Sequence, residues 1–145
     1  MLRVLFPILF ISLLTPVGVE AFQVPEIPRP FLAGVAKTVV RRGNPVIYYN
    51  PYTIARMGPH AGEFVRAHEY AHLRLGHFRR NISPRVMEAE ADLFAARNSS
   101  PRSVRAVQRW FMSGNGGGLI HGSSRARALR LSRGLSFQSR YRRVR

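Results

Sequence analysis

The chain has 145 residues, which is enough for one small domain and not for two. It contains no cysteine, so disulfides, thiolate metal sites and cysteine nucleophiles are excluded, and any metal must be held by histidine, aspartate or glutamate. The formal net charge of +16 predicts attraction to anionic polymers and surfaces through the overall field. The sequence shows no nucleic-acid-binding motif, so a specific nucleic acid partner is not expected.

The first 21 residues have the organisation of an export signal. Arg3 supplies a positive start, residues 4–14 form a short apolar run, and small residues precede a cleavage position after Ala21. The apolar run is too short for a comfortable membrane span. We therefore expect a signal peptide at 1–21 and a secreted or periplasmic mature chain without a membrane span. The alternative is a leader that is retained as an N-terminal anchor.

The next part of the chain predicts extended structure. Residues 22–34 are rich in proline and predict an extended arm. Two short β-like runs follow at 35–40 and 45–49, and the turn sequence at 41–44 (RRGN) between them predicts a β-hairpin. The pair Asn50-Pro51 predicts the end of the second strand.

Three helices are predicted in the central part of the chain. Apolar residues recur every three or four residues after about His60, which indicates an amphipathic helix that ends near Gly76. The pairs Ser83-Pro84 and Ser100-Pro101 each combine a capping residue with a proline at the first helical position, so each predicts a helix start. Residues 114–118 (GNGGG) predict a flexible loop.

The C-terminal part is strongly basic. A short helix is predicted at 124–131, and the basic, aperiodic residues 132–145 predict a disordered tail. This tail either contacts anionic surfaces weakly or has no partner. Together the elements predict an α+β fold over residues 35–131, with a short β-hairpin or sheet packed on three to four helices.

The clearest chemical signal lies in the first long helix. Residues 68–72 read His-Glu-Tyr-Ala-His, an H-E-x-x-H motif. Four residues advance a helix by a little over one turn, about 40° of rotation, so His68 and His72 face the same way and can share a tetrahedral metal. Glu69 lies beside His68, within reach of a metal-bound water whose pKa zinc lowers to about 7. The motif predicts a zinc site with Glu69 as the catalytic base, the alternative being a chance match.

A catalytic zinc needs a third protein ligand and an open fourth position. A metzincin arrangement would need glycine at 75 and histidine at 78, whereas this chain has Leu75 and Phe78. His77 points away from the metal if the helix continues through it, because five residues turn a helix by about 140° beyond one full turn. The third ligand is therefore expected from a carboxylate.

Three acidic residues lie close together at 88–92 (EAEAD), on the next predicted helix. A helix that crosses the first one can present a carboxylate from this segment to the metal. Asp92 lies one turn after Glu88, and it can accept the free ring N–H of a ligand histidine and so fix the orientation of that ring. Glu90 is expected to face away. The alternative is a solvated acidic face that offsets the many arginines.

Taken together, the motifs at 68–72 and 88–92 resemble those of the gluzincin family of HtpX-type and CAAX prenyl endopeptidases. That family often carries a further histidine five residues after the second ligand, where this chain has His77. It also carries a histidine followed six residues later by arginine, matched here by His121 and Arg127. The chain is similar, nearly as closely, to the ImmA-like metallopeptidases. The resemblance covers roughly residues 45–131.

The resemblance implies a small zincin-like domain with Zn²⁺ as cofactor, acting as a zinc metalloendopeptidase on a peptide or protein substrate. It implies Glu88 as the third zinc ligand beside the two histidines of the motif, and Asp92 as the carboxylate behind a ligand histidine. It implies that His121 and Arg127 bind or stabilise the oxyanion. One departure is Gly122, which stands where the family usually has proline.

Two other classes of protein stay open at this point. One is a zinc-binding scaffold without catalysis, which Glu69 argues against because a structural zinc site needs no such carboxylate. The other is a basic secreted protein that binds an anionic polymer, with the motif accidental. That protein would show salt-sensitive binding that is indifferent to chelators.

Overall fold

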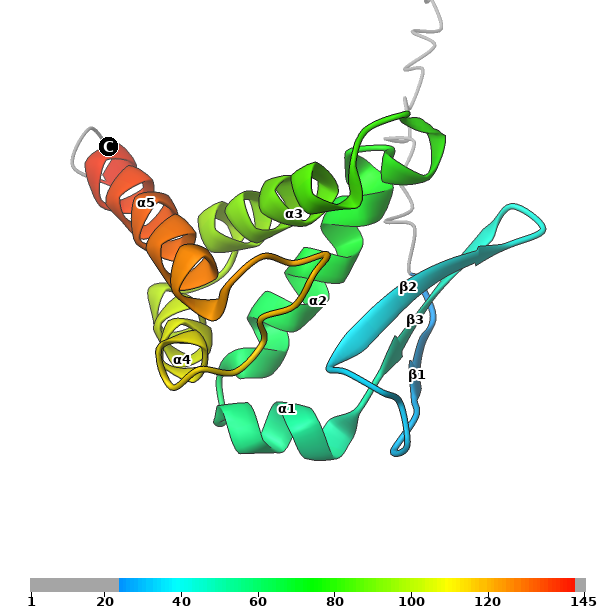
Figure 1. The fold of residues 1–145 in the computed structure, drawn as a ribbon, viewed down its shortest axis with the longest axis horizontal. Coiled ribbons are helices and arrows are strands. Elements are labelled where there is room, and N and C mark those ends of the chain that lie inside the picture. The colour runs from blue at the N-terminus through cyan, green and yellow to red at the C-terminus, as the bar shows by residue number, and fades with distance from the viewer. Residues whose placement is uncertain (1–23, 143–145) are drawn as a thin grey trace, which may run out of the picture.

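The structure is a computed structural model that describes residues 24–142. It has an α+β fold in which a three-stranded sheet and a set of helices pack around one long central helix, as Figure 1 shows. This confirms the fold class predicted from the sequence. The predicted signal peptide at 1–21 lies outside the described residues.

The sheet is built from β1 (Glu26–Pro28), β2 (Ala36–Arg41) and β3 (Asn44–Tyr49), in the order β1-β3-β2. β2 and β3 pair antiparallel, as the predicted hairpin requires. Arg42 and Gly43 connect them with φ of 50° and 83°, which suits the right-handed twist of the two strands. β1 pairs parallel to β3, so the proline-rich arm supplies a third strand.

Strand β3 leads directly into α1 (Pro51–Met57), a helix that the sequence interpretation missed because it took Asn50-Pro51 only as a strand end. The Asn50 side chain accepts hydrogen bonds from the backbone N–H groups of Tyr52 and Thr53, at 3.0 and 3.1 Å. Pro51 occupies the first helical position, where its missing N–H costs nothing. The same capping signal that predicts the later helices therefore also starts this one.

The motif helix is α2 (Ala61–Arg74), and the short 3₁₀ helix η1 (His77–Arg79) follows it. Gly76, with φ of 65°, reverses the chain between them. Next come α3 (Pro84–Asn98) and α4 (Pro101–Met112).

Both helix starts predicted from Ser-Pro pairs are confirmed. The Ser83 side chain caps α3 by accepting from the backbone N–H of Val86, and the Ser100 side chain caps α4 by accepting from that of Ser103. The Ser83 cap thus sets the first turn of α3, the helix that carries the acidic segment.

The last helix, α5 (Ser124–Arg142), is longer than the sequence predicts, and residues 132–142 are helical rather than disordered. Leu131 is fully buried, and Leu135 packs against the same core one turn later. Gly134 lets α5 approach Ala96 closely, since a Cβ there would overlap the Ala96 side chain. The Gln138 side chain adds two 2.7 Å hydrogen bonds to backbone carbonyls at the end of α3. The composition of this segment did not predict these contacts, because the few residues that make them lie among many arginines.

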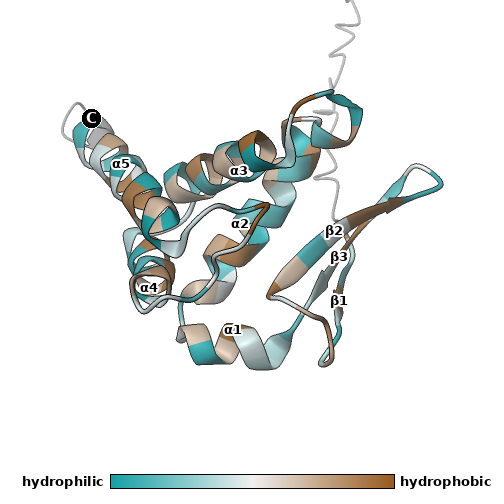
Figure 2. Ribbon diagram, in the orientation of Figure 1, coloured by the Kyte–Doolittle hydropathy of each residue, from teal (hydrophilic) through white to brown (hydrophobic). Residues whose placement is uncertain are grey.

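The hydrophobic core lies between α2, α3, α4 and α5, and the sheet covers the other side of α2 (Figure 1). Its buried members are Met57, Ala61, Phe64, Val65, Ala95, Ala96, Val104, Val107, Phe111, Ala128 and Leu131. In Figure 2 each long helix alternates between polar and apolar segments. None of the helices within residues 24–142 is long and apolar enough to cross a bilayer. The motif helix is thus held by neighbours on two sides, which makes it a rigid platform.

Candidate metal centre

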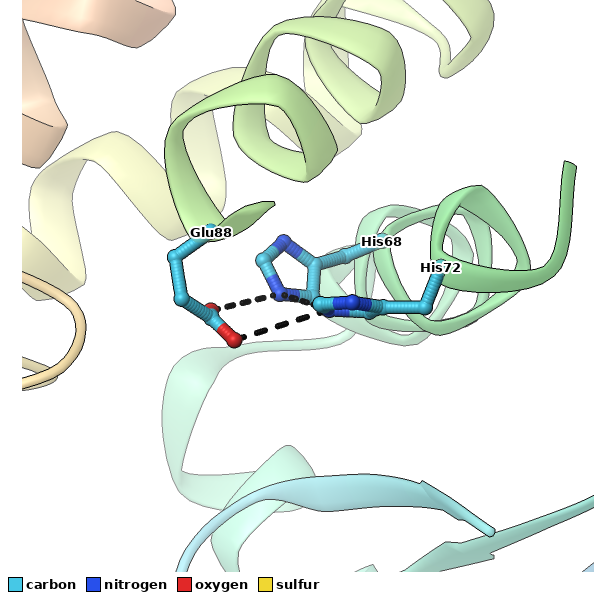
Figure 3. A group of neighbouring side chains, drawn as sticks. All are labelled: His68, His72 and Glu88. Atoms are coloured by element: carbon cyan, nitrogen blue, oxygen red, sulfur yellow. Dashed lines mark hydrogen bonds and ion pairs between the residues drawn. The ribbon is translucent and has the colours of Figure 1, made fainter. Parts of the chain in front are cut away.

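Three side chains from α2 and α3 converge at the centre of the fold. His68 and His72 project from α2 and Glu88 projects from α3 toward them, as Figure 3 shows. The Nε2 atoms of the two histidines are 3.4 Å apart, and the Glu88 carboxylate oxygens lie 3.1 Å from His68 Nε2 and 3.6 Å from His72 Nε2. Within the described residues this is the group of histidines and carboxylates close enough to hold a metal.

The spacing of these atoms fits a tetrahedral metal. Ligand atoms about 2.0–2.2 Å from a tetrahedral zinc stand roughly 3.3–3.6 Å from one another. The observed distances of 3.4 and 3.6 Å fall within this range, and the distance of 3.1 Å from His68 Nε2 to the other oxygen of Glu88 is slightly shorter. Two imidazoles and one carboxylate are also a donor set that zinc uses in catalytic sites. The residues present therefore fit the cofactor that the sequence predicts.

Asp92 lies behind the group, one turn further along α3. Its carboxylate is fully buried, and Oδ1 lies 3.1 Å from Nδ1 of His68, at an angle short of good hydrogen-bond geometry. Arg127 donates two hydrogen bonds to Asp92, at 3.0 and 2.7 Å, and Arg130 donates a third at 2.6 Å. A buried carboxylate held by two guanidinium groups can fix the ring of His68 from behind, as the sequence predicts for Asp92.

His121 and Arg127, the histidine and arginine six residues apart that resemble the family pattern, occupy different positions. His121 stands beside the metal group, with Nε2 3.3 Å from Glu88 Oε2 and about two fifths of its side chain exposed. Arg127 is buried, and besides Asp92 it donates to the Gly116 carbonyl at 2.8 Å and lies over the Phe111 ring. The structure thus gives Arg127 supporting contacts, whereas His121 is open to a ligand.

The cluster favours a positive charge. Burial lowers the pKa of His68, but the Asp92 and Glu88 carboxylates outweigh it and raise this pKa to about 9. Burial and the neighbouring His68 lower the pKa of His72 to about 4. Burial raises the pKa of Glu88, yet its contact with His68 brings the net value below the ordinary one. Two carboxylates that favour a cation beside His68 meet the electrostatic requirement of a metal site.

His77 contacts the site in a way that the sequence interpretation missed. Because α2 ends at Arg74 and Gly76 reverses the chain, the ring of His77 turns back toward α2. Its Nδ1 lies 2.9 Å from Nδ1 of His72, and its Nε2 lies 3.0 Å from Glu90. The sequence signal that could have predicted this contact is Gly76, because glycine readily adopts the left-handed conformation that reverses a chain after a helix. Glu90, which was expected to have no part in the site, thus contacts His77 and is itself held by Arg80.

Thr38 on β2 is the second residue that the sequence interpretation missed. Its hydroxyl lies 2.7 Å from the Glu69 carboxylate and 3.0 Å from the Glu69 carbonyl oxygen. Both residues are buried. No local pattern links positions 31 residues apart, so only the packing of β2 against α2 shows this contact. The side chain of the proposed base is therefore held by the sheet.

The chain was compared with models of protein families, with curated proteins and with solved structures, and none of the three comparisons found a match. The resemblance to HtpX-type and CAAX prenyl endopeptidases therefore rests on the sequence motifs alone.

Proposed function

We propose that this protein is a zinc-dependent endopeptidase that hydrolyses peptide bonds. The observation that carries the proposal is the convergence of His68, His72 and Glu88, whose ligand atoms lie 3.1–3.6 Å apart, with Glu69 next in sequence to the first ligand. A structural zinc site is closed by four protein ligands, whereas three ligands from two helices leave a position for water and substrate. The resemblance in the motifs supports the same class.

Zn²⁺ would be held by the two histidines and Glu88, where it would supply a bound water of lowered pKa and polarise a substrate carbonyl. The carboxylate of Glu69 accepts a proton from the attacking water and passes it to the leaving amine. Thr38 fixes the direction of that carboxylate through its hydroxyl. His121, whose Nε2 lies 3.3 Å from Glu88 Oε2, would donate a hydrogen bond to the substrate oxygen as negative charge develops there.

The proposal is tested by metal content and by a single variant of the base. The purified chain is expected to bind about one equivalent of zinc and to cleave an unfolded protein such as casein, with loss of cleavage on chelation. The variant Glu69→Gln should keep the zinc and lose the cleavage, since only the proton acceptor is removed. Full cleavage by that variant would contradict the mechanism, and a chain without zinc would contradict the class.

The same assays separate the two other classes. A zinc-binding scaffold would retain metal and cleave nothing in either form. A basic polymer-binding protein would bind anionic polymers in a salt-sensitive way whether or not chelator is present.

A further inference from the structure

A cavity of about 240 Å³ opens next to the metal group. Its floor is apolar and comes from the core, with the side chains of Phe64, Val65, Val107 and Phe111 exposed to it. His68 and Glu69 lie on its rim. Any group that enters this cavity therefore sits beside the residues that would carry out the hydrolysis.

The glycine-rich loop at 114–118 forms one wall of the cavity, where the lack of side chains at Gly116 and Gly117 lets the backbone approach α4 and α5 closely. A Cβ on Gly116 would lie 2.5 Å from the Phe111 ring, and a Cβ on Gly117 would lie 2.7 Å from the Ser124 hydroxyl. The loop backbone thus packs directly against α4 and α5, at the place where Figure 1 shows it passing beside α2. A residue with a side chain at Gly116 would displace the Phe111 ring and change the cavity.

The opposite wall is the segment that enters β2. Gly34, Val35 and Ala36 line it, and their small side chains leave room. β2 is an edge strand that pairs only with β3, and no other backbone partner joins it within residues 24–142. Thr38 ties this strand to Glu69. An extended peptide that adds to the free edge of β2 would therefore run past the metal group and the mouth of the cavity.

The size and chemistry of the cavity select its occupant. Sites for drug-sized molecules usually measure about 300–1,000 Å³, so a cavity of about 240 Å³ suits a single side chain. The polar side chains that line it are those of His68, Glu69, His121 and Arg127. Arg127 already binds Asp92 and Gly116, and the proposed hydrolysis uses the other three, so none of them is left to pair with a charged side chain in the cavity. A charged side chain would lose its hydration there without compensation, whereas a large apolar one would gain from burial.

We infer that this cavity is a specificity pocket, which binds one large apolar side chain next to the bond that is cut. The substrates are then extended peptides with leucine, phenylalanine or methionine at that position. This inference rests on the proposed peptidase function and adds the substrate class to it.

The test uses the full chain loaded with zinc and a set of peptides that differ at one position. Cleavage sites are mapped by mass spectrometry, and kcat/KM is compared for leucine, phenylalanine, alanine, aspartate and lysine beside the cut bond. The large apolar residues should exceed aspartate and lysine by more than about tenfold. Cleavage without this preference would overturn the pocket alone, and absence of any cleavage would overturn the peptidase as well.

Variants that fill the cavity test the same inference. Val107→Phe places a ring in the floor and should shift the preference toward alanine. Because this change can disturb the core, Ala33→Phe on the exposed rim provides a second way to narrow the pocket. The control is Ala55→Phe, an equal change at an exposed position of α1 outside the cavity lining. An unchanged preference in both pocket variants, with folding intact, would contradict the inference.

Discussion

The ring of His77 lies directly behind the ring of His72, with their Nδ1 atoms 2.9 Å apart. One nitrogen of such a pair must donate and the other must accept. The second nitrogen of His77 faces Glu90, which Arg80 holds through two contacts of 2.5 and 3.1 Å. The Glu90 carboxylate can only accept, so Nε2 of His77 carries the proton and Nδ1 of His77 is an acceptor. The Nδ1–H group of His72 therefore donates to Nδ1 of His77. Nε2 of His72 is thereby left with its lone pair directed at the metal group.

This arrangement makes His77 a positioning residue for a metal ligand, and metal affinity is its direct measure. His77→Leu should weaken zinc binding by about 10–100-fold, the usual effect of removing the partner of a ligand histidine. His77→Asn should restore part of the loss, because its side-chain oxygen can accept from Nδ1–H of His72. Competition with a chromophoric chelator at neutral pH measures both. Equal affinity of the leucine variant and the parent would show that His72 needs no such support.

Asp92 is expected to matter for stability even in the metal-free protein. Asp92→Asn leaves the buried guanidinium of Arg127 without its charge partner, a change that typically costs about 3–5 kcal/mol. The control is Glu26→Gln, which breaks a more exposed pair with Arg66 and should cost less than about 1 kcal/mol. Urea unfolding in the presence of chelator measures the two. Similar midpoints for both variants would contradict the assignment of Asp92 as the buried anchor.

The effect of Asp92 should also depend on pH. Burial raises the pKa of Asp92, but His68 and Arg127 outweigh it and hold this pKa well below the ordinary value. A carboxylate with a lowered pKa in the folded state stabilises the protein above the unfolded pKa of about 3.9, and the contribution is lost as the pH falls below that value. The difference in unfolding free energy between parent and Asp92→Asn should therefore shrink below about pH 4. Because Asp92 also helps, against the effect of burial, to raise the pKa of His68 to about 9, the difference should also decrease as the pH rises from about 6.5 toward 9. A difference that grows as the pH falls below about 4 would contradict the lowered pKa of Asp92.

Local chemistry explains what the sequence could predict. The spacing of His68 and His72 is a property of any helix, and the caps at Ser83 and Ser100 and the hairpin turn depend on a few adjacent residues. These features could therefore be read without a structure. Glu88 meets the two histidines only because α3 crosses α2. The sequence pattern suggested this crossing by placing an acidic segment on the helix that follows the H-E-x-x-H motif.

The features that were missed depend on contacts between distant segments or on an unexpected chain reversal. Thr38 reaches Glu69 across 31 positions, so no periodicity reveals it. The contact of His77 depends on the reversal of the chain at Gly76; the sequence predicts the end of the helix there, but the direction of His77 was considered only for a continuing helix. The tail from residue 132 was judged by its charge, although Leu135 and Gln138 fix it to the core. Charge averages over a segment hide the few side chains that anchor it.

Thr38 should affect the rate of hydrolysis more than the binding of metal. Thr38→Val removes the hydroxyl that holds the Glu69 carboxylate and keeps the shape of the side chain. A hydrogen bond to a charged group is worth about 1.5–3 kcal/mol, so kcat should fall by roughly tenfold or more while zinc affinity stays near that of the parent. Thr38→Ser retains the hydroxyl and should retain most of the rate. A valine variant with the kcat of the parent would show that Glu69 is positioned without the sheet.

The docking of α5 on α3 can be tested at a single glycine. Replacing a glycine inside a helix by alanine normally stabilises a protein by about 0.5–1 kcal/mol. At Gly134 the added methyl group would overlap the side chain of Ala96, and such overpacking costs about 1–3 kcal/mol, so Gly134→Ala should be destabilising overall. Gly62→Ala is the matched control, because its nearest neighbour, a methyl carbon of Ile54, is 3.7 Å from the added Cβ, an ordinary contact. Thermal unfolding should therefore move in opposite directions for the two variants. A rise in stability for both would mean that α5 does not pack against α3 as the structure has it.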